Sequence, residues 1–294
     1  MIALIDGDVV CYGVGFAAEE RYYEATDEAG ETRIVSPIEV TKLKKDYPGE
    51  YTYEPKVEPV SKAMAKKYLR YKITDILNKA RTGKYEIYIT DKNLSKNFRS
   101  HITGNLQYKG NRKPSAFSKP FHYGLIRNTL RNTYGATRVS GIEADDALGI
   151  RQMELNAQGI ASVIVSIDKD MWQIPGFHCN LNTGKWMIAG DPGRLWIDNS
   201  YTKPMLKGHG IKWLYAQMLL GDVIDNIHGV KGYGDMKTFK YLDRYSTKED
   251  LHSAVNALYL KQGYTQEQFD GTLRLLTILR EPLSCATKQD LNTK

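Results

Sequence analysis

Short apolar runs alternate along this chain with longer segments of helical periodicity. Residues 1–6 (MIALID), 85–90 (YEIYIT) and 161–168 (ASVIVSID) are apolar and rich in β-branched side chains, which predicts three buried strands. Residues 61–81 and 143–159 carry apolar side chains at helical spacing, and a glycine stop signal lies at or just beyond the end of each. This order predicts an α/β fold with a mostly parallel central sheet flanked by helices.

The pattern changes after the third strand. Residues 180–188 (NLNTGKWMI) are typical of a hairpin with a turn at the glycine. Residues 211–226 (IKWLYAQMLLGDVIDN) predict an amphipathic helix that ends in Asp222 and Asp225, three positions apart and therefore on one face.

Two further helices and one polar segment complete the pattern. The helices are expected to open with capping boxes at Ser246–Glu249 and at Thr265–Gln268. Residues 18–59 are polar and rich in tyrosine, and a hairpin around residues 27–30 is expected there. No function follows from this polar segment.

Basic residues are concentrated in one part of the chain. The net charge of the 294 residues is +7, and residues 92–138 contain ten Lys or Arg and no Asp or Glu. Aromatic side chains are interleaved with these cations, a mixture that suits phosphates and unstacked bases of single-stranded nucleic acid. A solvated basic surface is the alternative, although such surfaces usually mix both signs of charge.

The cysteines and the N-terminal residues exclude several classes. Three widely spaced cysteines argue against a disulfide scaffold and a cysteine-based zinc site. The opening MIALIDGDVV lacks the basic region of a signal peptide, and no apolar run reaches the ~18 residues of a membrane helix. We therefore expect a cytoplasmic protein with no membrane segment.

Acidic residues follow the predicted strands and open one helix: Asp6, Asp91, Asp168, Glu143, Asp145 and Asp146. Ligands bind outside the carboxyl ends of parallel strands. Two carboxylates about 4 Å apart repel by ~4 kcal/mol at an effective dielectric near 20, whereas a helix start returns only roughly 0.3–1 kcal/mol. Oxygen ligands without His or Cys favour Mg²⁺ or Mn²⁺. A divalent-cation site is predicted, with a simple helix start as the alternative for the cluster at 143–146.

The order of these motifs resembles the 5′-nuclease family. IDGD at Asp6, ITDK at Asp91, YKGNRK at 108–113, GIEADD, SIDKD and LLGDVIDNIHGVKGYG follow one another as in flap endonucleases, the 5′-nuclease domain of bacterial DNA polymerase I and bacteriophage 5′→3′ exonucleases. The likeness covers nearly the whole chain, and the free-standing phage enzymes are the most similar.

The resemblance implies a PIN-like 5′-nuclease core, a helical arch and a C-terminal helical lobe with a helix–turn–helix DNA-binding element. The core would be residues 1–190, including an insertion at 18–59 and the basic arch at 92–125, and the lobe would be residues 191–294.

The resemblance also implies two Mg²⁺ (or Mn²⁺) ions held by nine acids. One ion is expected near the first four of these residues and the second near the other five: Asp6, Asp91, Glu143 and Asp145; then Asp146, Asp168, Asp170, Asp222 and Asp225. Asp8 is expected only to cap the helix that follows it.

The YKGNRK motif suits contact with a phosphate. Lys109 and Arg112 are three residues apart, so on a helix they share a face and can hold one phosphate. By resemblance both are catalytic cations, Tyr108 stacks on a terminal base, and Lys113 binds nucleic acid. A basic turn without a particular role is the alternative.

The glycine-rich segment at 229–234 (GVKGYG) lacks the spacing of a dinucleotide fingerprint. It suits a tight turn between two helices that offers backbone N–H groups to a phosphate. The resemblance implies that it binds duplex DNA, in some members with K⁺, through these residues: Gly229, Lys231, Gly232, Gly234 and Lys237. An ordinary interhelical loop is the alternative.

These features predict a metal-dependent 5′→3′ exonuclease with flap or structure-specific endonuclease activity and 5′-phosphate products. The expected partner is DNA with a 5′ end, a flap or a single-strand/duplex junction, and the protein is expected to be a monomer. The C-terminal CATKQDLNTK does not resemble a sliding-clamp-binding peptide. A ribonuclease acting on RNA or RNA–DNA hybrid is one alternative, and a non-catalytic structure-specific DNA-binding module is the other.

Overall fold

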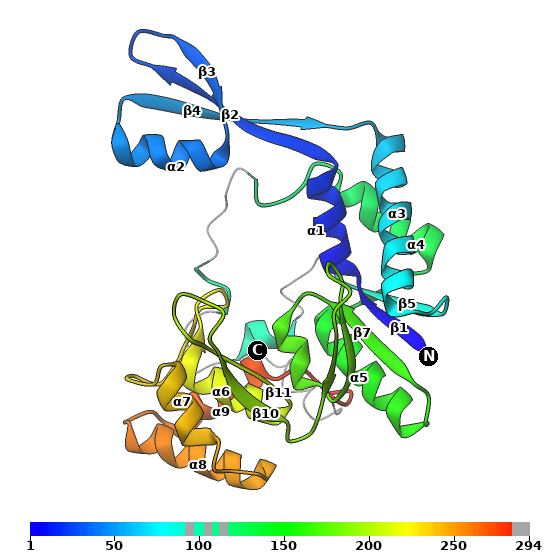
Figure 1. Cartoon of the computed structure of the whole chain (residues 1–294), viewed down its shortest axis with the longest axis vertical. Helices are drawn as coiled ribbons and strands as arrows, with labels where there is room; N and C mark the ends of the chain where they lie inside the picture. The colour runs from blue at the N-terminus through cyan, green and yellow to red at the C-terminus, as the bar shows by residue number, and fades with distance from the viewer. Residues whose placement is uncertain (92–96, 103–107, 112–116, 284–294) are drawn as a thin grey trace. The chain divides into compact units, whose positions relative to one another are not determined.

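A computed structural model describes residues 1–91, 97–102, 108–111 and 117–283 of the chain (Figure 1). The chain forms two compact units. The first holds Met1–Asp8, Ile76–Lys113 and Gly135–Lys294, and the second holds Val9–Asp75 and Pro114–Tyr134. The boundary expected at residue 190 falls inside the first unit and stays a prediction, and the expected arch at 92–125 lies partly outside the described residues.

A six-stranded sheet organises the first unit (Figure 1). Its order is β6-β5-β1-β7-β8-β9, and all neighbours are parallel except β8 and β9. The strands are β1 (Ile2–Asp6), β5 (Tyr85–Thr90), β6 (Thr137–Val139), β7 (Ser162–Ser166), β8 (Gly176–Asn180) and β9 (Trp186–Ala189). The predicted α/β class, its mostly parallel sheet and the hairpin at 180–188 are confirmed.

Helix α5 (Ala144–Ala157) covers the centre of this sheet. It packs against β1, β5 and β7, and Leu148 and Leu155 share a buried cluster with Leu4 and Ile164. Leu4 of β1, Ile164 of β7 and Tyr88 of β5 lie in or against this cluster, and Arg151 of α5 also pairs with Glu86 of β5. The start of α5 is therefore fixed close to the ends of the strands.

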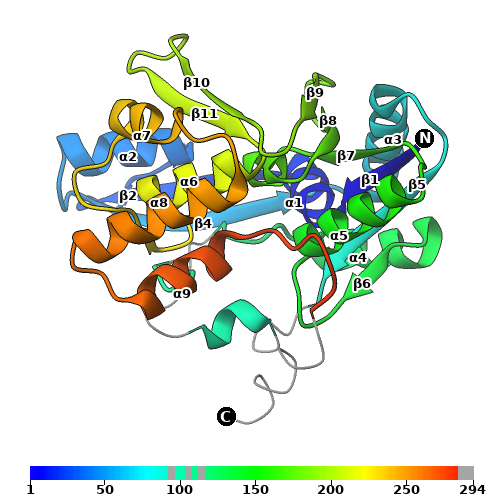
Figure 2. The same ribbon diagram turned by 90° about the horizontal axis from the view of Figure 1, so that it is seen from below.

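Four helices form the second half of this unit, around a core that surrounds α6 (Figure 2). They are α6 (Ile211–Leu220), α7 (Asp235–Leu242), α8 (Lys248–Lys261) and α9 (Gln266–Leu276), with the hairpin β10 (Arg194–Asp198) and β11 (Met205–His209) beside α7. The capping box at Thr265 and Gln268 is confirmed. The box expected at Ser246 is wrong by one residue, because the Thr247 hydroxyl accepts from Asp250 N and Thr247 is the N-cap.

The helix predicted over 211–226 is too long. Helix α6 ends at Leu220, and Gly221 takes a φ of 78°, where a side chain would collide with the backbone of Gly229. Two short strands follow, β12 (Gly221–Asp222) and β13 (Ile227–His228). Asp222 therefore ends β12 and Asp225 lies in the turn between β12 and β13, so neither lies on a helix face; the 222–226 loop comprises the end of β12 and this turn.

The second unit contains the polar segment and three helices. Helix α1 (Gly7–Ala17) leads into it, α3 (Lys62–Ala80) leads out of it, and α4 (Tyr123–Tyr134) belongs to it entirely. The segment between α1 and α3 forms an antiparallel sheet, β3-β2-β4, covered by α2: β2 (Glu19–Asp27), β3 (Thr32–Val35), β4 (Tyr51–Pro59) and α2 (Pro37–Asp46). The hairpin expected around residues 27–30 is confirmed.

This small sheet has a core of its own, formed by Ala25, Val35 and Val40 with tyrosines around them. Its base is bonded to the segment before α4. The Glu19 carboxylate accepts from Phe121 N at 2.7 Å, and His122 Nε2 lies 2.7 Å from Val60 O.

Among the helices in the described ranges, none combines the length and the apolar character needed to cross a bilayer.

Candidate active site

Three aspartates lie at the carboxyl edge of the central sheet. Asp6 ends β1, Asp91 follows β5, and Asp168 lies two residues beyond β7. Since β1 pairs in parallel with both β5 and β7, these three ends are neighbours. The Ser166 hydroxyl donates to Asp6 Oδ2 at 2.8 Å and accepts from Asp168 N at 3.1 Å. The convergence expected from the sequence is therefore present.

The start of α5 is fastened to this edge. Glu143 is the N-cap residue, and Ala144 N donates to the Thr90 hydroxyl at 2.9 Å. Asp8, in the first turn of α1, accepts from Thr90 N at 3.0 Å and so holds the end of β5. This position explains Asp8 as a structural acid.

The carboxylates at the centre of the site repel one another, which is seen in the pKa values of three aspartates. Burial, together with the charges of Asp6 and Asp168, raises the pKa of Asp145 well above its ordinary value. Burial also raises the pKa of Asp168, and the negative charges of Asp225 and Asp222 raise it further. For Asp170, burial and the charge of Asp168 raise the pKa to about 7.

The loop at 222–226 joins the same group of acids. Asp222 and Asp225 lie close enough to Asp168 for their charges to act on it, although they come from the far side of α6 in sequence. Asp170, in the short helix η3 (Lys169–Gln173), accepts from Gln217 Nε2 of α6 at 2.6 Å. Carboxylates from the sheet edge and from the helical half of the unit thus share one region.

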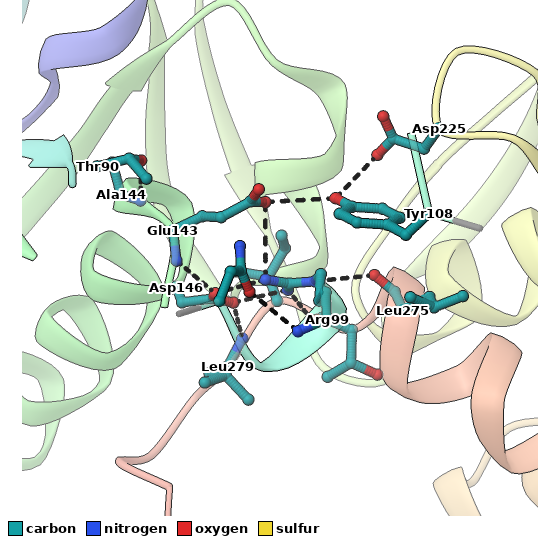
Figure 3. Close-up of polar contacts among 12 residues, drawn as sticks. Thr90, Arg99, Tyr108, Glu143, Ala144, Asp146, Asp225, Leu275 and Leu279 are labelled. Carbon is teal, nitrogen blue, oxygen red and sulfur yellow. Dashed lines mark hydrogen bonds and ion pairs between the residues drawn. The ribbon is translucent and has the colours of Figure 1, made fainter. Parts of the chain in front are cut away.

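Tyr108 reaches this region from the basic segment (Figure 3). Lys109 follows it in the chain and contacts the same acids. The Tyr108 hydroxyl lies 3.3 Å from Glu143 Oε2 and 3.2 Å from Asp225 Oδ2, and donates to this pair of carboxylates. Lys109 Nζ pairs with Glu143 Oε1 at 2.8 Å. Burial alone would raise the pKa of Glu143, but Lys109 and Arg99 lower it below its ordinary value.

The backbone at Lys109 differs from the expectation. Lys109 has a φ of 58° and lies in a turn, so the helix face that it was expected to share with Arg112 is wrong at this residue. Arg112 and Lys113 lie outside the described residues.

Asp146 is buried and its carboxylate is bonded to Arg99 (Figure 3). It is 0% exposed, and Arg99 donates to both of its oxygens at 2.6 and 2.8 Å. Glu143 N and Leu279 N donate to the same carboxylate, each at 3.1 Å. A carboxylate has about four lone-pair sites, and all of them are used here. These four hydrogen bonds argue against direct metal binding by Asp146, and its expected role as a ligand remains a prediction.

Arg99, in the short helix η2 (Phe98–His101), is the residue that the sequence did not single out. It is 2% exposed, and it donates to Leu275 O at 3.0 Å and Thr277 O at 2.6 Å in addition to Asp146. The three acids of EADD (143–146) need a counter-charge, and this need is the signal that could have pointed to Arg99. Arg99 is one of the ten cations in residues 92–138, all of which suit nucleic acid, so nothing in the sequence distinguishes it from the others.

The sequence matches two kinds of known protein over part of its length. No protein-family model matches. DNA polymerase I of Deinococcus radiodurans is 28% identical over 163 residues, which cover 55% of this chain and 16% of that protein. DNA polymerase I of Thermus aquaticus is 29% identical over 157 residues, or 51% of this chain and 17% of that protein. A 5′-3′ exonuclease of Mycoplasma genitalium is 29% identical over 119 residues, 40% of each chain.

Solved structures match over nearly the whole chain. A flap endonuclease of bacteriophage T5, determined with DNA and metal ions, has a TM-score of 0.53 and 13% identity and covers 93% of this chain and 88% of its own. The 5′-exonuclease of bacteriophage T5 with zinc has a TM-score of 0.50 and 14% identity, at 94% and 88%. The chain has the 5′-nuclease fold. Together with the sequence matches, this fold confirms the resemblance indicated by the motifs, and the chain spans only 16% and 17% of the two polymerases named above.

The glycine turn of this 5′-nuclease fold lies between β13 and α7. Gly229 has no room for a side chain beside Leu219 and Leu220, Gly232 has a φ of 79°, and Gly234 is the N-cap of α7. Lys231 is exposed, and Lys237 Nζ lies 4.2 Å from the centre of the Tyr233 ring. The turn follows a two-stranded ribbon, so it does not connect two helices directly as expected.

The donor set of the 5′-nuclease fold suits hard divalent cations. Within the described ranges, no three Asp, Glu, His or Cys side chains are already gathered as a metal site. Carboxylates nevertheless adjoin one another closely enough to raise the pKa of Asp145, Asp168 and Asp170. A cation relieves such repulsion, and oxygen ligands suit Mg²⁺ and Mn²⁺.

Proposed function

We propose that the chain is a divalent-metal-dependent 5′→3′ exonuclease that acts on DNA and also cleaves flaps or related junctions. One observation carries the proposal: carboxylates from three parallel strand ends, from the start of α5 and from the 222–226 loop adjoin Lys109 of the basic segment. Relatives named for 5′-3′ exonuclease and flap endonuclease activity support it.

Two Mg²⁺ or Mn²⁺ ions are proposed as cofactors. Asp146 is left out because hydrogen bonds occupy its lone pairs. The remaining acids form two adjoining groups: Asp6, Asp91, Glu143 and Asp145 for one ion, and Asp168, Asp170, Asp222 and Asp225 for the other. Such a pair of ions, when bound, supplies a nucleophile from water and stabilises the attacking and leaving oxygens of an in-line displacement at phosphorus. Structures of similar proteins that hold metal ions support a divalent-metal site.

Lys109 and Tyr108 are proposed to act on the substrate directly. Lys109 is an ammonium at the rim of the acids, and a phosphate oxygen can replace its present partner Glu143. Burial and the charge of Glu143 raise the pKa of Tyr108, so its hydroxyl keeps its proton and remains a donor. We retain Arg112 and Lys113 as further phosphate contacts on the strength of the motif alone.

The glycine turn is proposed to hold the duplex part of the substrate. Its backbone N–H groups precede α7, and Lys231 and Lys237 add positive charge. A K⁺ ion at this turn belongs to the same proposal. Replacing K⁺ by Li⁺ in the buffer should weaken duplex binding if the ion is used there.

The proposal is tested with 5′-flapped, nicked and single-stranded DNA, each labelled at either end. We expect Mg²⁺-dependent shortening from the 5′ end, no cutting in EDTA, and much slower cutting of RNA strands of the same sequence. Asp168→Ala should abolish cutting and leave DNA binding measurable, whereas Asp27→Ala, at the tip of the β2–β3 hairpin, should have no effect. Tight binding without cutting in Mg²⁺ and in Mn²⁺ would make the chain a DNA-recognition protein instead.

A further inference from the structure

Two apolar side chains project from the loop that carries Asp222 and Asp225. Val223 is 85% exposed and Ile224 is 71% exposed. In the described part of the chain, Val223 is the most exposed of the large hydrophobic residues. Adjacent exposed apolar side chains beside a polar site mark a surface that contacts something else.

The loop holds these side chains in fixed positions. Asp222 Oδ1 accepts from Ile224 N at 2.8 Å and from Asp225 N at 3.2 Å. Asn226 N donates to Val223 O at 3.3 Å, and Asn226 has a φ of 61°, which closes the turn. The backbone is thus tightly bonded within the loop, so the exposure of the two side chains is a property of the folded turn.

Residues 108–111 (YKGN) of the basic segment are hydrogen-bonded to the same loop. Asn111 Nδ2 donates to Val223 O at 2.5 Å, and Lys109 N donates to Asp225 O at 3.0 Å. The apolar pair therefore lies between two proposed metal ligands and next to the proposed phosphate-binding lysine. Whatever covers Val223 and Ile224 must also be compatible with the charges on both sides.

Nucleic acid satisfies this requirement and an apolar protein surface does not. A protein partner that buried Val223 and Ile224 would also desolvate Asp222, Asp225 and Lys109, at a large cost. A nucleotide brings an apolar base face and deoxyribose together with a phosphate for the neighbouring cations.

We propose that Val223 and Ile224 form an apolar wedge that packs against the base and sugar of the nucleotide adjoining the scissile phosphate. Inserted apolar side chains substitute for base stacking and favour an unstacked nucleotide. The wedge therefore selects substrates whose terminal pair opens easily, and it sets the position of the cut. This inference rests on the proposed function of the same site.

The test uses the full chain with Val223 and Ile224 both changed to serine, and Ile34→Ser as the matched control. Ile34 lies on β3 and is also 71% exposed. One assay follows the fluorescence of 2-aminopurine next to the scissile phosphate during binding in Ca²⁺. The other compares cleavage in Mg²⁺ of a fully paired end with that of an end carrying one terminal mismatch.

Wild type and Ile34→Ser should show a rise in 2-aminopurine fluorescence on binding. The double variant should lose most of this rise and cut the paired end about tenfold more slowly, while cutting of the mismatched end changes about twofold or less. An unchanged fluorescence rise, or an equal loss on both ends, overturns the wedge. Failure of the proposed function is distinct, because wild type would then cut neither end.

Discussion

Replacing Arg99 by methionine should destabilise the first unit far more than removal of an ordinary ion pair. The change leaves Asp146 charged at 0% exposure, with two of its four donors gone. Breaking a buried pair from one side costs about 3–5 kcal/mol. The carbonyls of Leu275 and Thr277 lose their donor as well, which places the expected loss near the upper end of that range.

Tryptophan fluorescence reports on the unfolding of the first unit alone. All four tryptophans, at positions 172, 186, 196 and 213, lie in the first unit, so a urea titration in EDTA reports its unfolding without the second unit. Arg151→Met is the matched control. Arg151 binds Glu86 at 2.9 Å but is 29% exposed, and its loss should cost about 1 kcal/mol or less.

One further result distinguishes the reasoning. Arg99→Met combined with Asp146→Leu should recover most of the stability, because an apolar pair needs no counter-charge. Equal losses in Arg99→Met and Arg151→Met would refute the buried-charge account.

Four other predictions address the acids, the glycine turn and the proposed phosphate contact. Asp145→Asn should raise the thermal unfolding midpoint in EDTA and remove most of the additional rise that Mg²⁺ gives wild type; an unchanged Mg²⁺ effect contradicts its ligand role. Burial and Asp168 raise the pKa of Asp170 to about 7, so the folded protein binds more protons than the unfolded chain, and metal-free wild type should approach the stability of Asp170→Asn as the pH falls from about 8 to about 6. A constant difference in denaturation midpoint across that range would exclude the repulsion. Gly229→Ala should lose roughly 2 kcal/mol or more because its Cβ meets backbone atoms, whereas Gly124→Ala, with open space in α4, should be neutral or stabilising on urea titration. Lys109→Ala should lower kcat about 10²-fold in single-turnover cleavage with little change in KM, and a loss confined to KM reduces this residue to a docking charge.

The sheet edge could be predicted because its signal is local. Each of the runs before Asp6, Asp91 and Asp168 is apolar and β-branched, and strands of that composition are buried in parallel sheets. Parallel neighbours place their carboxyl ends together whatever the rest of the chain does. Three of the proposed ligands were therefore located before any tertiary contact was known.

The 222–226 loop could not be predicted in the same way. Val223 and Ile224 continue the helical spacing of α6, so the periodicity extends through Asp225. The helix ends because Gly221 and Gly229 approach each other closely, which is a contact between residues eight positions apart. Periodicity counts Val223 and Ile224 as buried, and the fold exposes both of them.

Arg99 shows a different limit of the sequence. Its partners are Asp146, 47 residues away, and two carbonyls about 180 residues away in α9 and just beyond it. Composition assigned all cations of the basic segment to nucleic acid, and no local pattern separates the one that is buried. For the same reason the sequence offers no partner for Asp146.

The two ends of the segment between α1 and α3 lie next to each other. Val60 N donates to Ala18 O at 2.9 Å, and the strands that follow and precede these residues pair from Glu19 with Pro59 onward. Because its two ends are already joined and its core is self-contained, an ancestral chain could have acquired this module in one insertion event without displacing either helix.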